Sequence, residues 1–256
     1  MLAIGLNYTV TDGVARIAMD RAPVNAITHA FLIDLIAAIE KADKDPAIGA
    51  IVLASHVAGR FCAGLDLPYV QSCDKDQIRA ILSDLYTRLY DVQHKLSKPT
   101  IAEVNGTARG GGVTLAISCD VLVAADDVTF GYPEIELGLP PAIHFAHLPR
   151  IIGRHRAFEL LFTGRAFSAQ EAQTLGLVSR VCDPTALGDE AMALATQLAS
   201  KPGMKLARAA FMRQNDFDYR RSIAVAVEDF CNAFDTAEAR VRRDAFVEKL
   251  AVKRRS

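Results

Sequence analysis

Two segments of this chain each place a glycine-rich turn directly after a short apolar strand. The first turn, at 59–67, follows the apolar run 50–54, and the second, at 105–116, follows the run 100–104. Small residues let backbone N–H groups approach a ligand closely, and a helix after the second turn would add its free N-terminal amides. Two such donors that converge on one carbonyl oxygen form an oxyanion hole. The turns therefore predict a pair of backbone amides that hold one developing negative charge.

Strands and helices are expected to alternate through the first two-thirds of the sequence, and helices to gather in the last third. Asp12-Gly13 predicts a hairpin turn, and Thr28 can cap a helix that Asp45-Pro46 ends. A second helix, apolar on one face, is expected at 78–96. This alternation favours an α/β fold with largely parallel strands. Strands are also predicted at 48–54, 100–104, 121–125, 128–132 and 178–181, and a closing helix at 236–250.

Composition and charge narrow the class of protein. The 256 residues are 51% hydrophobic and 23% charged, enough for one large core, and no linker-like stretch divides them. A formal net charge of −1 gives no field that would attract nucleic acid or an anionic membrane. Five dispersed cysteines without a CxxC pair suggest reduced thiols and a cytoplasmic location. The start lacks a signal-peptide pattern, and no apolar run approaches the roughly 20 residues that span a bilayer.

Several common site motifs are absent from the sequence. The glycine-rich turn at 110–112 lacks both the P-loop pattern and the GxGxxG spacing of a dinucleotide site. The six histidines form no HxxxH pair, and no tight carboxylate cluster occurs, which disfavours a metal site. No GxSxG element of a serine hydrolase is present. The glycine turns are therefore interpreted as donors to a carbonyl oxygen.

The order and spacing of several fragments resemble the crotonase (enoyl-CoA hydratase/isomerase) superfamily over nearly the whole chain. The resemblance implies a ββα spiral core at 1–195 and a helical region at 196–256 that builds homotrimers or dimers of trimers. It also implies an acyl-CoA substrate, with coenzyme A as part of the substrate and no separate cofactor. The fragments include Pro23-Val24-Asn25-Ala26, residues 61–67 and 104–112, Cys119-Asp120, residues 130–134 and 162–165, Gly176-Leu177-Val178 and residues 246–249.

By position, the resemblance assigns the thioester carbonyl to the N–H groups of Leu65 and Gly111. Hydratases of the family carry one Glu two residues after the triple glycine and another in the later Pro-Glu element. This chain has Thr114 at the first position and Glu134 at the second. A hydroxyl cannot act as a base at neutral pH, whereas one carboxylate can move a proton from C2 to C4 of a 3-enoyl thioester. The arrangement is similar to the Δ3-Δ2 enoyl-CoA isomerases of the family.

Three alternatives to this isomerase interpretation remain open. Thr114 and Glu134 together could position water, as in an enoyl-CoA hydratase (a lyase) acting on 2-enoyl-CoA. His144 could be a second acid–base residue, as in a crotonase-fold hydrolase or lyase. The chain could also be a catalytically silent CoA-binding protein. In the isomerase interpretation, an apolar pocket supplied by Phe130, Ile135, Leu137 and Leu139 would raise the pKa of Glu134 to suit a proton shuttle.

The remaining expected contacts concern the substrate and the subunit interface. The backbone at 22–26 is expected to bond the adenine of CoA, and Phe246 and Lys249 to contact the adenine and phosphates. Much of the apolar surface of the last third is expected to need a partner subunit to cover it; its residues are Ile223, Val225, Val227, Phe230, Phe234, Phe246 and Leu250. The full set of substrate contacts expected from the resemblance is Ala22, Val24, Ala26, Ala63, Gly64, Gly110, Thr114, Tyr132, Pro141, His144, Phe246 and Lys249.

Overall fold

The computed structural model describes residues 5–215, 219–234 and 236–253. The larger of two sheets has six strands in the order β1-β2-β3-β5-β7-β10. Only β1 and β2 pair antiparallel in it, joined at the expected Asp12-Gly13 turn; its other neighbours are parallel. Its strands are β1 (Leu6–Thr11), β2 (Val14–Met19), β3 (Ala50–Ser55), β5 (Thr100–Val104), β7 (Val121–Ala125) and β10 (Arg180–Cys182). The α/β class predicted from the sequence is confirmed.

A second, four-stranded sheet corrects the expectation that 59–62 and 106–109 belong to turns. Its order is β4-β6-β8-β9. Gly59 of β4 pairs with Gly106 of β6, and a Cβ on Gly106 would lie 2.0 Å from the Gly59 carbonyl carbon, so this pairing requires glycine. Along the chain, β3 of the larger sheet is followed by β4 of the smaller one, β5 by β6, and β7 by β8. This succession is the repeated strand–strand unit of the spiral. The strands are β4 (Gly59–Cys62), β6 (Gly106–Arg109), β8 (Thr129–Gly131) and β9 (Phe167–Ser168).

Helices cover the larger sheet and follow the strand pairs. Every residue of β3 and β5 is buried, and α9 packs on β2, β3, β5 and β7. Thr28 caps α1 as predicted, accepting from Phe31 N. The helix expected at 78–96 forms as three successive helical segments. The helices are α1 (His29–Lys44), α2 (Leu67–Gln71), α3 (Lys75–Leu82), η1 (Ser83–Arg88), α4 (Leu89–Lys95), α5 (Gly111–Ile117), η2 (Pro133–Leu137), α6 (Ala142–Ile152), α7 (Arg154–Thr163), α8 (Ala169–Thr174) and α9 (Leu187–Ala199).

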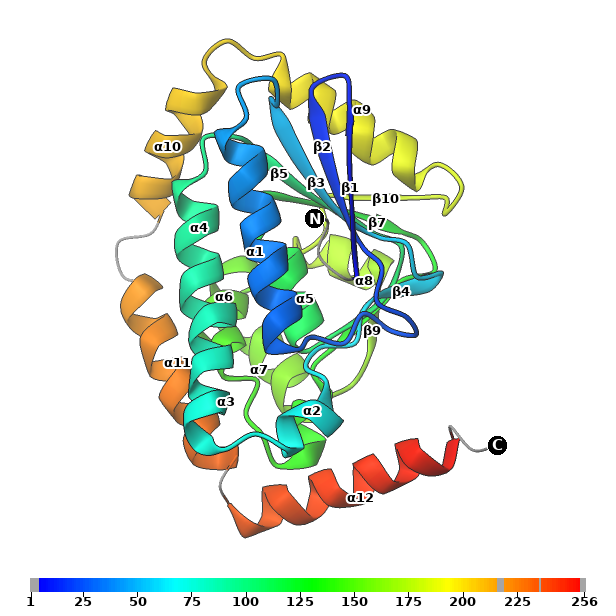
Figure 1. Cartoon of the computed structure of the whole chain (residues 1–256), viewed down its shortest axis with the longest axis vertical. Coiled ribbons are helices and arrows are strands. Elements are labelled where there is room, and N and C mark those ends of the chain that lie inside the picture. Colours follow the sequence, from blue (N-terminus) through cyan, green and yellow to red (C-terminus); the bar gives the residue numbers. More distant parts are fainter. Residues whose placement is uncertain (1–4, 216–218, 235, 254–256) are drawn as a thin grey trace.

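Three further helices form the C-terminal region: α10 (Met204–Asn215), α11 (Tyr219–Phe234) and α12 (Ala237–Lys253). Helix α11 packs on α6 and α3, and its Ile223, Val227, Phe230 and Phe234 are buried by the chain itself. These four therefore need no partner to cover them, contrary to the expectation; the side chain of Val225 lies outside the described residues. Helix α12 runs along the bottom edge of Figure 1. The expected domain division at 195/196 falls inside α9.

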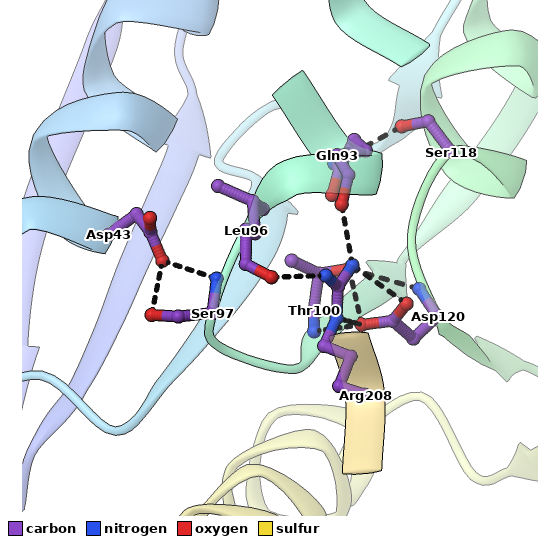
Figure 2. Close-up of polar contacts among 8 residues, drawn as sticks. All are labelled: Asp43, Gln93, Leu96, Ser97, Thr100, Ser118, Asp120 and Arg208. Carbon is purple, nitrogen blue, oxygen red and sulfur yellow. Dashed lines mark hydrogen bonds and ion pairs between the residues drawn. The ribbon is translucent and has the colours of Figure 1, made fainter. Parts of the chain in front are cut away.

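A buried ion pair attaches α10 to the core. The Arg208 side chain donates to both carboxylate oxygens of Asp120, at 2.8 and 3.0 Å, and to the carbonyls of Leu96 and Gln93, at 2.6 and 2.7 Å. Thr100 N donates to the same carboxylate at 2.8 Å. Figure 2 shows this guanidinium between Gln93 and Leu96, at the end of α4, and Asp120, the residue that precedes β7. Asp120, one of the residues that carry the family resemblance, therefore has a structural role here.

We expect Arg208→Ala to destabilise the fold by about 3 kcal/mol or more, because it leaves a buried carboxylate without its cation. Arg208 and Asp120 have only 4% and 16% of their side chains exposed. The matched control is Arg180→Ala, whose ion pair with Glu190 is 45% and 48% exposed; it should stay close to wild type. Urea unfolding of both variants checks this. A loss for Arg208→Ala no larger than for Arg180→Ala would contradict the assigned role.

Candidate active site

The first glycine turn lies beside the segment that precedes α1. Gly64 has φ +89°, and Leu65 forms a parallel bridge with Ile27. In this bridge Ile27 N donates to Gly64 O at 2.8 Å, and Asp66 N donates to Ile27 O at 2.9 Å. The N–H of a residue at the centre of such a bridge points away from the partner segment. The Leu65 N–H therefore points away from Ile27.

The second glycine turn starts α5 and touches the first turn. Gly110, at φ +47°, precedes the first helical residue, Gly111, and no side chain in the described part of the chain caps this helix end. A Cβ placed on Gly64 would lie 2.9 Å from Arg109 O and 3.2 Å from Gly111 N. The close approach of the two turns therefore requires Gly64. Since the first amides of a helix have no acceptor within it, Gly111 N–H is placed next to the Leu65 turn.

A small cavity of about 60 Å³ lies between the two turns. Since a cavity needs roughly 10–15 Å³ of such space to hold one water molecule, this space fits the reacting end of a ligand rather than a whole acyl chain. Glu134 is the only carboxylate among the described residues that line it. The lining residues are Ala63, Gly64, Leu65, Leu67, Leu85, Tyr86, Gly110, Gly111, Pro133, Glu134, Leu137, Leu139 and Phe230.

The Glu134 carboxyl group is held against the second turn in apolar surroundings. A Cβ on Gly110 would lie 1.9 Å from Glu134 Oε1, so only glycine leaves room for the carboxyl there. Glu134 Oε2 is buried and has no hydrogen-bond partner among the residues that the structure describes. This burial raises the pKa of Glu134 to about 7, above its usual 4.5. A raised pKa was expected, and near pH 7 the group can both accept and release a proton.

The residues that form the apolar wall differ in part from the expected ones. Leu137 and Leu139 line the cavity, but Phe130 and Ile135 do not. Phe130 stacks on Phe167 with ring centroids 5.7 Å apart, because β8 and β9 pair in the second sheet. Tyr86 and Phe230 line the cavity instead, and sequence spacing gave no signal for them.

The raised pKa of Glu134 predicts a pH-dependent stability. Its folded-state pKa lies above the unfolded value, so the neutral carboxyl favours folding fully below about pH 4.5, and this advantage is lost as pH rises through about 7. Glu134→Gln stays neutral throughout. Relative to wild type, the variant should therefore gain about 2–3 kcal/mol of unfolding free energy between pH 5 and pH 8. Denaturant titrations at both pH values measure this gain, and an equal difference at the two would contradict it.

Thr114 and His144 lie behind the second turn and do not line the cavity. Thr114 Oγ1 is 3.2 Å from His144 Nε2. Tyr132 packs on the His144 ring with centroids 4.4 Å apart. Burial lowers the pKa of His144 to about 3, so its imidazole is neutral at physiological pH. Pro141 precedes the helix that carries His144.

The expected CoA contacts lie in two separate places. Residues 22–26 adjoin the first turn, because Ala63 N donates to Val24 O at 3.0 Å. Arg21, which the sequence interpretation missed, bonds both Ala26 O and Asp66 and fixes this segment to the turn. Phe246 and Lys249 are on α12, are exposed and do not line the cavity.

Another, larger cavity, of about 520 Å³, lies at the opposite end of α5. Asp120 is the only acidic residue among the described residues that line it. The carboxylate of Asp120 is already paired with Arg208. In the described ranges, no three His, Cys, Asp or Glu side chains are grouped as metal ligands. The described helices include none that is both long and apolar enough to cross a bilayer. The cavity beside Glu134 is therefore the candidate active site.

The two sheets, the repeated strand–strand–helix units and the C-terminal helices form a crotonase fold. The chain belongs to the enoyl-CoA hydratase/isomerase family, whose model matches residues 9–254, and it is an enzyme of that family. A probable enoyl-CoA hydratase of Bacillus subtilis is 30% identical over 249 residues, covering 95% of this chain and 96% of the relative.

Solved structures give the same fold. An enoyl-CoA hydratase from Bacillus anthracis superposes with a TM-score of 0.79 at 30% identity, over 96% of each chain. Human mitochondrial delta3-delta2-enoyl-CoA isomerase superposes with a TM-score of 0.85 at 22% identity, over 97% of this chain and 99% of the other. At this lower identity, the likeness concerns the fold alone.

Proposed function

We propose that this enzyme is a Δ3-Δ2 enoyl-CoA isomerase that uses Glu134 as its single acid–base group. One observation carries the proposal: Glu134 is the only described carboxylate that lines the cavity between the two glycine turns. Its ionised form removes a proton from C2 of a 3-enoyl thioester, and the electron pair passes to the thioester oxygen as a dienolate. The N–H groups of Leu65 and Gly111 stabilise that oxygen. The protonated Glu134 returns the proton at C4, which leaves the conjugated 2-enoyl product.

A second candidate, hydration of 2-enoyl-CoA, is supported by the names of relatives. Several are called enoyl-CoA hydratases, and one of Syntrophomonas wolfei, 31% identical, is a crotonyl-CoA hydratase. In that reaction water adds its hydroxyl at C3 and a proton at C2. Glu134 would have to serve both transfers, because Thr114 offers a hydroxyl in place of a second carboxylate.

An absorbance assay with two thioesters separates the two reactions. A 3-enoyl-CoA should gain conjugated absorbance if the enzyme isomerises it, and a 2-enoyl-CoA should lose absorbance if the enzyme hydrates it. We expect the gain to be the faster reaction. Loss from the 2-enoyl thioester alone would favour the hydratase, and no turnover of either would overturn both candidates.

We further propose a cytoplasmic homotrimer or dimer of trimers, assembled through the helices after α9. No disulfide joins any of the five cysteines, all of which lie in the described ranges, and this fits a reducing compartment. Helix α12 exposes Val241, Phe246 and Val252 by 68%, 39% and 69%, and these apolar side chains suit a subunit contact. In such an assembly Phe246 and Lys249 would contact the CoA of a neighbouring subunit. A monomer at micromolar concentration in light scattering would contradict this assembly.

A further inference from the structure

The peptide group that joins Gly110 to Gly111 has a carbonyl that faces Thr114 and an N–H that is proposed to bind the substrate. Its carbonyl accepts from Thr114 N at 3.1 Å and from Thr114 Oγ1 at 3.5 Å. Its N–H belongs to Gly111, one of the two proposed donors to the thioester oxygen. Because a peptide group is planar and rigid, anything that holds the carbonyl also sets the direction of this N–H.

The Thr114 hydroxyl is itself held from behind by His144. With the imidazole proton on Nε2, this N–H donates to Thr114 Oγ1 over 3.2 Å, and the hydroxyl proton points to the Gly110 carbonyl. Thr114 is 2% exposed and His144 1% exposed, so water does not compete for these groups. The Tyr132 ring, 4.4 Å from that of His144 between centroids, fixes the imidazole.

The start of α5 does not need these two polar side chains. The backbone bond from Thr114 N to Gly110 O already forms the first helical turn, and an aliphatic residue would fill the same space. Burying a hydroxyl and an imidazole costs free energy unless they are hydrogen-bonded. Their presence directly behind a donor peptide indicates a role in the site.

We infer that Thr114 and His144 are positioning residues, which orient and polarise the Gly110–Gly111 peptide so that the Gly111 N–H is a stronger donor to the thioester oxygen. This inference rests on one part of the proposed function, the binding of a thioester oxygen by the Gly111 N–H. In the tautomer with the proton on Nε2, the bonds run in one direction, from His144 Nε2–H to the Thr114 hydroxyl and on to the Gly110 carbonyl. Each bond in such a chain strengthens the next. His144 neither touches substrate nor exchanges a proton in this arrangement.

The test compares two substitutions that break the chain of bonds with two that keep it. Thr114→Val removes the hydroxyl at nearly constant shape, and Thr114→Ser retains it. His144→Leu removes the donor, and His144→Gln places an N–H near the position of Nε2. For each protein, difference infrared spectroscopy gives the carbonyl stretch of bound butanoyl-CoA labelled with ¹³C at the thioester carbon. Assays with 3-enoyl-CoA give kcat and KM.

We expect wild type to lower the carbonyl frequency of the bound thioester relative to water. Thr114→Val and His144→Leu should lose much of this shift and lower kcat about tenfold, with KM changed less than about threefold. Thr114→Ser and His144→Gln should recover most of both. If His144→Leu does not fold, the Thr114 pair decides the question alone.

Two results would overturn the inference. One is a full carbonyl shift and wild-type kcat in folded Thr114→Val. The other is a wild-type protein that fails to bind the probe or to lower its carbonyl frequency. The carbonyl shift requires binding but no turnover. A wild-type enzyme that shifts the carbonyl yet leaves 3-enoyl-CoA unchanged would therefore refute the isomerase proposal without refuting this one.

Discussion

Glu134→Gln is expected to lower kcat at least about 100-fold while affinity for a saturated acyl-CoA stays near wild type. Glutamine has nearly the same shape as glutamate but cannot accept the C2 proton. Steady-state assays with a 3-enoyl-CoA give kcat, and calorimetric titration with butanoyl-CoA gives the affinity.

Glu136→Gln is the matched control, because Glu136 lies in the same short helix but is exposed. It should retain wild-type kcat. If Glu134→Gln keeps its activity, a single-carboxylate mechanism at this position is wrong, whatever the effect on binding.

Gly111→Pro is expected to reduce thioester turnover by about 100- to 1,000-fold, the usual effect of losing one oxyanion donor. Proline suits the first position of a helix, so α5 should still form, but it has no N–H to offer. Circular dichroism checks folding, and kcat measures the loss.

Gly111→Ala separates the loss of the donor from the effect of added bulk. It keeps the N–H, and its Cβ would lie 3.3 Å from both Ile27 Cδ1 and Leu85 Cδ2, a tight but adjustable contact. It should therefore lose far less activity than Gly111→Pro. Equal losses in the two variants would show that crowding, and not the amide, matters at this position.

The larger sheet could be predicted from the sequence, whereas only one strand of the smaller sheet was expected: the segment 128–132, which forms β8. Largely apolar runs such as 100–104 form fully buried strands. Their hydrophobicity alone is enough to locate them in the sequence. The strands at 59–62 and 106–109 are short and begin with glycine. What makes them strands is their pairing with each other across nearly fifty residues of chain, and no local pattern records a partner so distant.

The site was predictable where it depends on the backbone and on one carboxylate. The glycine turns and Glu134 could be located by order and spacing, and all three meet at one cavity. Phe230 also lines that cavity, but its place depends on how α11 packs on α6 and α3. The 3.2 Å contact of Thr114 with His144 likewise joins residues that only the folded chain brings together.

The wall contributed by Phe230 has a consequence for the order in which the enzyme is made. During synthesis the ribosome releases both glycine turns and Glu134 well before residue 230. Until α11 emerges, the cavity beside Glu134 lacks the wall that Phe230 contributes. The raised pKa of Glu134, which depends on burial, should therefore arise late in synthesis. Under the proposed mechanism, incomplete chains should therefore be inactive.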